Sequence, residues 1–134
     1  MIEISPQIAE RLAKEQVIWL TTSKADGTPL PNPVWFLWNG EQFLIFTEAD
    51  SVKMKNMSRN ARVALNLNSD SDGGNIAIFQ AEAEINPAPI NEEELSSYVS
   101  KYSEGMQRIG LSTGVLIADY HLIRIVPTKF RTVS

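Results

Sequence analysis

The sequence predicts a mainly β fold, in which about six antiparallel strands close into a small barrel flanked by three short helices. Short runs of β-branched and aromatic residues recur along the 134 residues, and turn dipeptides separate several of them. Closure into a barrel is the usual way in which many short strands avoid exposed edges. The length suits a single domain, which we assign to residues 1–134.

The first half of the chain is expected to begin with a helix and to continue as a three-stranded meander. Ser5-Pro6 marks the helix start, because serine is a favoured N-cap and proline fits the first helical position, and the helix runs to about Glu15. Asp26-Gly27 and Asn39-Gly40 are strong turn signals between the strands. The predicted strands are Val17–Ser23, Val34–Trp38 and Phe43–Thr47.

The second of these strands carries two unusual features. Pro31 and Pro33 precede it and donate no ladder hydrogen bond, so they are expected at its start or on a sheet edge. Alternation along Val34–Trp38 places Trp35 and Leu37 on one face and the other three residues on the opposite face. With large side chains on both faces, two interpretations stay open: ordinary core packing, which this feature by itself favours, and contact of one face with a planar ligand or a second subunit.

The second half is expected to hold two helices, two strands and a closing strand or strand pair. Three glutamates follow Asn91 and favour a helix start there, since acidic residues stabilise the positive end of a helix. The apolar positions of one strand change parity, so a bulge or bend is expected near Phe79, and residues 102–114 give no clear signal. The expected helices are Val52–Asn60 and Asn91–Lys101, and the strands are Val63–Leu67, Ile76–Ile85 and Tyr120–Thr132.

Composition excludes several classes of function. A net charge of −4 and a pI near 5.0 argue against nucleic acid and anionic membrane surfaces as partners. The absence of cysteine excludes disulfides and thiolate metal sites, and with His121 as the only histidine no metal site is predicted. No apolar run approaches the roughly 20 residues of a membrane span, and the acidic N-terminus is unlike a signal peptide, so a cytoplasmic location is expected.

The most informative segment is Thr47–Arg62, which holds four basic residues of an acidic chain. Lys53 and Lys55 fall in or near the first turn of the predicted helix, where the helix dipole makes a positive charge mildly unfavourable. An anion at that end would be held by free backbone N–H groups, the Ser51 hydroxyl and a lysine ammonium. Two interpretations stay open, a phosphate site and a solvated surface helix.

Two other signals are weak. Gly110–Gly114 matches the G-x-S-x-G pattern of hydrolase nucleophiles, but that motif needs a preceding strand, and here the preceding residues resemble a helix or loop. His121 alternates within a predicted strand, where a histidine is more often structural than catalytic. No catalytic residue is assigned.

Motifs in the order PVWF (Pro33–Phe36), SVKMKNM (Ser51–Met57) and RNARVAL (Arg59–Leu65) resemble the pyridoxamine-phosphate-oxidase-like split-barrel superfamily. The chain is most similar to its small branch that uses the deazaflavin coenzyme F420. The resemblance continues through Gly73–Ile85 and Ile123–Arg131 and covers nearly the whole chain.

This resemblance implies a six-stranded antiparallel split β-barrel with short flanking helices, of α+β class by helix content. It also implies a homodimer with two cofactor sites at the subunit interface. The phosphate contacts would come from the end of one strand and the basic helix after it, and the tricyclic ring would lie along the strand before. Carried over by position, the cofactor-binding residues are Pro33, Val34, Trp35, Thr47, Ser51, Lys53, Lys55 and Asn56.

The implied function is that of an oxidoreductase, a reductase that passes a hydride from FMN or F420 to a small organic substrate. The branch resemblance favours F420, whose acidic tail needs a basic groove that Lys24, Lys129 and Arg131 would line. The alternative is a non-catalytic flavin carrier or haem-binding module on the same fold, in which His121 would be the axial ligand of a haem.

Overall fold

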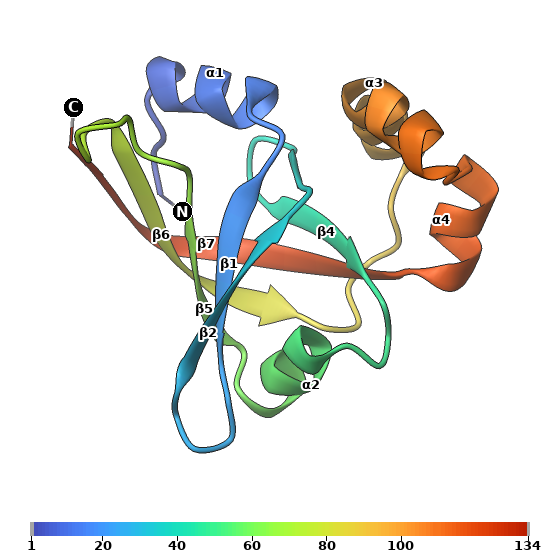
Figure 1. The fold of residues 1–134 in the computed structure, drawn as a ribbon, viewed down its shortest axis with the longest axis horizontal. Coiled ribbons are helices and arrows are strands. Elements are labelled where there is room, and N and C mark those ends of the chain that lie inside the picture. Colours follow the sequence, from blue (N-terminus) through green and yellow to red (C-terminus); the bar gives the residue numbers. More distant parts are fainter. Residues whose placement is uncertain (1, 134) are drawn as a thin grey trace.

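The computed structural model describes residues 2–133 and, within them, one curled half-barrel sheet of seven strands (Figure 1). The strands are β1 (Ile18–Ser23), β2 (Pro29–Val34), β3 (Leu37–Trp38), β4 (Phe43–Thr47), β5 (Arg62–Asn66), β6 (Ile76–Glu84) and β7 (His121–Val133). Their order in the sheet is β2-β1-β5-β6-β7-β4-β3, and every neighbouring pair is antiparallel. The mainly β, split-barrel prediction is therefore confirmed.

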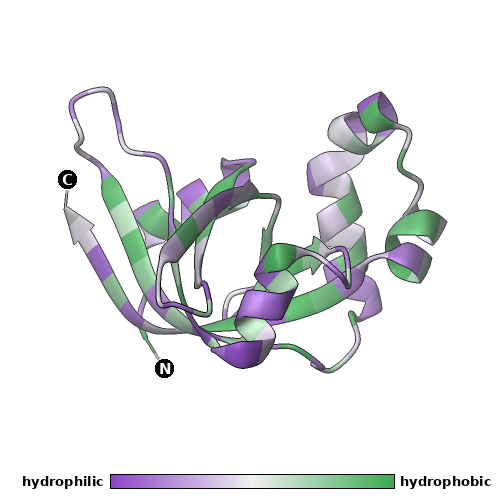
Figure 2. Ribbon diagram, turned by 60° about the horizontal axis from the view of Figure 1, so that its bottom comes forward, coloured by the Kyte–Doolittle hydropathy of each residue, from purple (hydrophilic) through white to green (hydrophobic). Residues whose placement is uncertain are grey.

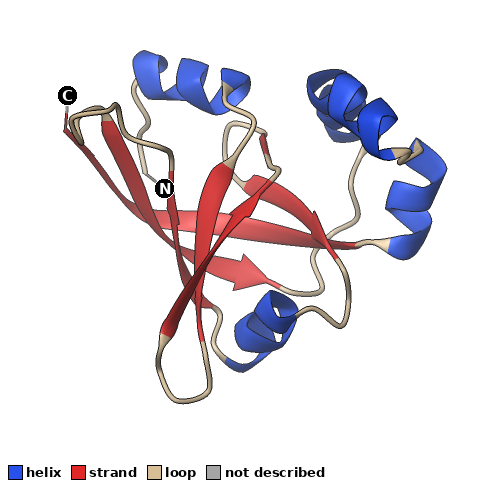
Figure 3. Ribbon diagram, in the orientation of Figure 1, coloured by secondary structure: helices blue, strands red, loops and turns tan. Residues whose placement is uncertain are grey.

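Four helices within the described residues lie around the sheet, with α3 and α4 together beside one end of β7 (Figure 3). They are α1 (Pro6–Lys14), α2 (Val52–Arg59), α3 (Glu92–Ile109) and α4 (Thr113–Asp119). None of the helices within residues 2–133 combines the length and apolar character that crossing a bilayer requires.

The prediction of one continuous strand over Val34–Trp38 is wrong. This part of the chain belongs to two separate strands, so the sheet has seven strands instead of the six predicted. β2 ends at Val34 and pairs with β1, whereas β3 begins at Leu37 and pairs with β4. Trp35 and Phe36 carry the chain from one edge of the sheet to the other, and the Phe36 N–H donates to the Tyr102 hydroxyl instead of a neighbouring strand. The predicted edge position of the prolines is confirmed, because β2 is an edge strand.

The barrel interior is filled by one face of each strand. On β6, Ala77, Phe79, Ala81 and Ala83 are all buried, so this strand keeps one parity throughout. The register shift lies between Gln80 and Ala81, close to the predicted bulge, but the extra residue belongs to β7. The parity change predicted from the sequence is wrong, because the isoleucines at the start of β6 lie on the outer face. Figure 2 shows hydrophobic and hydrophilic residues alternating toward the end of β7.

A second apolar cluster lies between the sheet and the helices α3 and α4. α3 extends to Ile109, well beyond the predicted end near Lys101, because Tyr98, Tyr102 and Met106 continue one apolar stripe at helical spacing. Gly110 then ends the helix in the left-handed conformation, with φ of 71°.

The predicted alternation of side chains around the β2–β3 junction is confirmed. Trp35 and Leu37 join the second cluster, whereas Val34, Phe36 and Trp38 pack against the barrel interior. Both faces of this segment are therefore covered by the chain itself, as in the ordinary-packing alternative.

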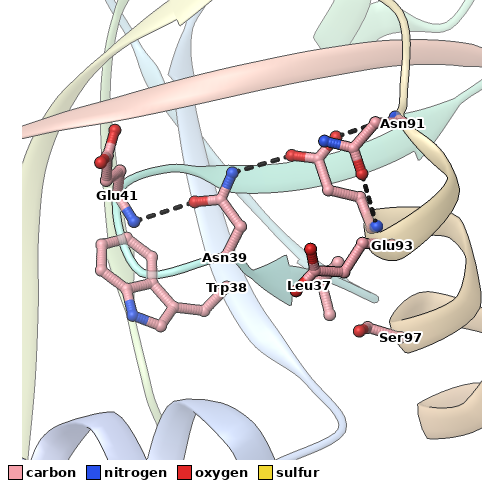
Figure 4. Close-up of a pocket in the computed structure, with 8 residues that line it drawn as sticks. Leu37, Trp38, Asn39, Glu41, Asn91, Glu93 and Ser97 are labelled. Atoms are coloured by element: carbon pink, nitrogen blue, oxygen red, sulfur yellow. Dashed lines mark hydrogen bonds between the residues drawn. The ribbon is translucent and has the colours of Figure 1, made fainter.

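A buried ion pair fixes the start of α3 to the barrel. Arg124 of β7 donates to both carboxylate oxygens of Glu94 at 2.7 and 2.8 Å, and the two side chains are only 8% and 9% exposed. Asn39 donates to Glu94 at 2.9 Å, and Asn91 forms a capping box with it (Figure 4). The hydrogen bond from Arg124 is the main reason that the pKa of Glu94 falls from 4.5 to about 2.

This ion pair predicts that the unfolding free energy decreases at acidic pH. Because the folded-state pKa of Glu94 is depressed, its contribution is fully present above about pH 4.5 and is lost as the pH falls toward 2. The loss amounts to about 3 kcal/mol of unfolding free energy. Urea unfolding at a series of pH values checks this, and Glu94→Gln should flatten the curve across that interval. An equal acid loss in both proteins would contradict the assignment.

Candidate cofactor site

The junction between β4 and α2 brings together two of the predicted phosphate contacts. Thr47 ends β4 and is buried, and its hydroxyl lies 3.2 Å from that of Ser51. Ser51 is the N-cap of α2 and accepts a hydrogen bond from the Met54 N–H at 3.2 Å. The structure thus places two hydroxyl groups side by side at the positive end of a helix.

The charge at this helix end is not neutralised from within the helix. The first turn of α2 contains no acidic residue, whereas that of α3 contains three. Lys53 is half-buried and Lys55 is exposed, and neither forms an ion pair with any residue in 2–133. Glu48 and Asp50 lie in the preceding loop and are both exposed to solvent. A half-buried lysine beside free helical N–H groups suits an anionic ligand.

Asn56 has a different environment from the other predicted contacts. It is 4% exposed, its amide nitrogen donates to the Thr22 hydroxyl at 3.0 Å, and its oxygen accepts from Arg59 at 2.9 Å. These bonds tie α2 to β1, since Arg59 also reaches the Ser23 carbonyl at 3.2 Å. Asn56 supports the helix that carries the lysines, and its direct contact with a phosphate stays a prediction.

The three residues predicted beside the tricyclic ring do not share one surface. Pro33 is exposed on the free edge of the sheet, and Val34 packs against the barrel interior. Trp35 is half-buried and stacks on Tyr102, with ring centroids 4.5 Å apart and planes 8° from parallel. A side chain at Gly105 would meet this indole at 2.9 Å, so α3 closely covers one side of Trp35.

Two α3 residues that bind the backbone around Phe36, Lys101 and Tyr102, were not identified from the sequence. The Tyr102 hydroxyl accepts from the Phe36 N–H at 2.8 Å and donates to the Gln16 carbonyl at 2.7 Å. Lys101 donates to the carbonyls of Phe36 and Leu12 at 3.0 and 3.2 Å, and burial lowers its pKa to about 8. The spacing of Tyr98, Tyr102 and Met106 was the available signal for this helix.

The serine of the Gly110–Gly114 motif and His121 both have structural roles. Ser112, the serine of the G-x-S-x-G match, is the N-cap of α4 and accepts from the Val115 N–H at 3.1 Å. A helix precedes it where a hydrolase would need a strand. The Nε2 atom of His121 contacts the Ile85 carbonyl, so this nitrogen already has a partner.

Two cavities lie near these elements. One of about 410 Å³ lies between the β3–β4 turn and α3 and is lined by Glu41, Glu93 and Glu94, so its charge disfavours an anion (Figure 4). A groove of about 500 Å³ crosses β1, β5, β6 and β7 and is lined by Arg62 and Lys129. None of the eight predicted cofactor residues lines either cavity.

Solved structures share this fold. A conserved hypothetical protein from Mycobacterium tuberculosis is 23% identical with a TM-score of 0.77, covering 100% of this chain and 86% of that one. A protein named F420 reductase is 22% identical with a TM-score of 0.63, covering 91% and 94%. HutZ, a haem storage protein from Vibrio cholerae, is 18% identical with a TM-score of 0.68, covering 98% and 96%.

No curated protein sequence matches the chain. The sequence profile of the family described as pyridoxamine 5'-phosphate oxidase, however, matches residues 4–134. The resemblance that the sequence motifs indicated is confirmed by this match and by the shared fold. Because the profile covers nearly the whole chain, the protein belongs to the pyridoxamine 5'-phosphate oxidase family.

Proposed function

We propose that the protein is an oxidoreductase that binds FMN or F420, with the cofactor phosphate at the N-terminus of α2. The observation that carries this proposal is the unneutralised positive end of α2, where Lys53 has no ion-pair partner among residues 2–133. The donor set suits a phosphate, because it combines helical N–H groups, the hydroxyls of Thr47 and Ser51 and an ammonium group.

Each residue of this set has a distinct role in the proposal. Lys53 supplies the charge that pairs with the phosphate, and Lys55 adds to the positive field from its exposed position. One of the Thr47 and Ser51 hydroxyls donates to the phosphate while the other donates to its neighbour, and Asn56 holds the helix against β1. The bound cofactor would supply hydride transfer to a small organic substrate, while the chain binds and orients it.

The groove lined by Arg62 and Lys129 supports F420 over FMN. Its two cations lie on the outer face of the sheet, and Glu82 is the acidic residue that lines it with them. An acidic cofactor tail would find more favourable charge there than in the cavity beside α3. Lys129 was predicted to line such a groove, whereas Lys24 and Arg131 do not line this one. The protein named F420 reductase shares the fold.

Homodimerisation, with the cofactor site completed at the subunit interface, is part of the proposal, as is a cytoplasmic location. Exposed apolar side chains on the outer surface, Ile78, Ile109, Val115 and Ile117, give a partner subunit apolar area to bury. Sedimentation of the purified protein tests the dimer.

A non-catalytic haem-binding module is the second candidate, supported by the shared fold of HutZ. Its weak point is His121, since the Nε2 atom of that side chain is occupied by the Ile85 carbonyl. Haem titration separates the candidates: a Soret shift that disappears in His121→Ala would favour the haem module.

Lys53→Ala is expected to weaken binding of the preferred cofactor at least tenfold, equivalent to about 1.4 kcal/mol, because the phosphate loses a charge-assisted contact. Parallel fluorescence titrations of FMN and F420 measure this, with the exposed α1 residue Lys14→Ala as the matched control. The phosphate site is refuted if neither cofactor binds, or if both lysine variants bind as the parent does.

A further inference from the structure

β2 is an edge strand with an unusual sequence, because prolines occupy every second position. It pairs only with β1, so its other edge has no neighbouring strand among residues 2–133. In the ladder, Pro29, Pro31 and Pro33 lie opposite Ser23, Thr21 and Trp19.

The hydrogen-bonding direction of each β2 residue follows from this register. Opposed residues of an antiparallel pair alternate between bonded and non-bonded pairs, and a proline cannot complete a bonded pair because it lacks an N–H. The hairpin closes with a bond from the Lys24 N–H to the Thr28 carbonyl at 2.8 Å, which fixes the even-numbered residues as the bonded set. Leu30, Asn32 and Val34 therefore face β1, and the prolines face the free edge.

The free edge of β2 is consequently an acceptor-only edge. It presents the carbonyls of Pro29, Pro31 and Pro33, about 7 Å apart along the strand, and no N–H group. All three prolines are exposed, and their carbonyls accept no hydrogen bond from residues 2–133. An ordinary sheet edge offers donors and acceptors in alternation, so this edge differs from it chemically as well as in shape.

We propose that this acceptor-only edge selects the ring of the bound cofactor, favouring a 5-deazaflavin over a flavin. The inference rests on the proposed function and on the ring position that the family resemblance implies, along the strand at Pro33. It goes further, because it assigns the choice of ring to the missing N–H groups of two prolines.

The discrimination has a simple chemical basis. The central ring of oxidised FMN carries a nitrogen, N5, with an in-plane lone pair that needs a hydrogen-bond donor when it is removed from water. A 5-deazaflavin has a C–H group at that position and needs none. The edge offers no donor along Pro31–Pro33, but its carbonyls can accept from the ring imide N–H that both cofactors share. The flavin alone would be left with an unsatisfied polar atom.

The test compares FMN with 5-deaza-FMN, which differ at this one atom and carry the same phosphate. The parent protein is expected to bind 5-deaza-FMN about threefold to tenfold more tightly, the range of one hydrogen bond. The double variant Pro31→Ala with Pro33→Ala restores two N–H groups to the edge, so the ratio should fall toward one through tighter FMN binding. Pro29→Ala, at the far end of the same edge, is the matched control and should keep the parent ratio.

The outcomes separate this inference from the proposed function. A parent ratio near one, or a ratio that the double variant leaves unchanged while circular dichroism shows the fold intact, overturns the role of the edge. If Lys53→Ala still weakens both ligands in that case, the phosphate site stands without it. Failure of both ligands to bind the parent protein overturns the two proposals together.

Discussion

Arg124→Ala is expected to lower the unfolding free energy by about 3–5 kcal/mol, because it leaves the Glu94 carboxylate buried without its cation. The guanidinium also donates to the carbonyls of Ala88 and Pro89 at 2.9 and 3.0 Å, so the segment that leads into α3 loses its anchor as well. Chemical denaturation at pH 7 measures the loss.

Lys14→Ala provides the matched control for this prediction. Lys14 pairs with Glu10 at 2.7 Å, the same distance as the buried pair, but the two side chains are 74% and 63% exposed. Solvent screens exposed pairs, so they contribute little to stability, and this variant should stay close to the parent. Equal losses in the two variants would show that burial does not determine how much the Arg124–Glu94 pair contributes to the unfolding free energy.

Tyr102→Ala is expected to cost about 3–5 kcal/mol, the usual loss for truncating a buried aromatic side chain. Tyr102 is 1% exposed and stacks on Trp35, and its hydroxyl forms hydrogen bonds with the backbone of Phe36 and Gln16. Tyr102→Phe keeps the ring and removes only the hydroxyl, so about 1–3 kcal/mol is expected for the unpaired backbone groups. Equilibrium unfolding gives both values.

The Trp35 part of the near-ultraviolet circular dichroism, obtained by difference from Trp35→Phe because Trp19 and Trp38 also contribute, distinguishes a local effect from general loosening. Without its stacking partner the indole should lose its fixed orientation in Tyr102→Ala, while Tyr102→Phe should retain the signal. Tyr120→Phe, a half-buried tyrosine of the same cluster, is the control. An unchanged Trp35 signal in Tyr102→Ala would show that α3 does not position this residue.

Local sequence patterns predicted most elements of the fold well. The helix start at Ser5, the strand Phe43–Thr47 and the capped start of α3 at Asn91 agree with the structure. These features depend on neighbours within a few residues, such as a cap, a turn or an alternation, so the chain specifies them locally. The extent of α3 beyond Lys101 was missed because its apolar stripe is partly aromatic and includes glycine.

The candidate site divides in the same way. The basic N-terminus of α2 after Ser51 follows from sequence, since a cap and the lysines of the next turns lie within five residues. The hydrogen bond from Asn56 to Thr22 joins residues 34 apart, and no local pattern indicates it. The hydrogen bond between Phe36 and Tyr102 joins residues 66 apart, and no local pattern indicates it either.

Short motifs in the sequence are enough to identify the family, the β-rich class and the position of a basic helix start. The division of Val34–Trp38 between the two edges of the sheet, and the direction of the β2 prolines toward a free edge, follow from the three-dimensional structure alone. Strand pairing and the direction of backbone hydrogen bonds depend on partners distant in the chain, so local patterns do not specify them. The same alternation is compatible with one strand or two until those partners are in place.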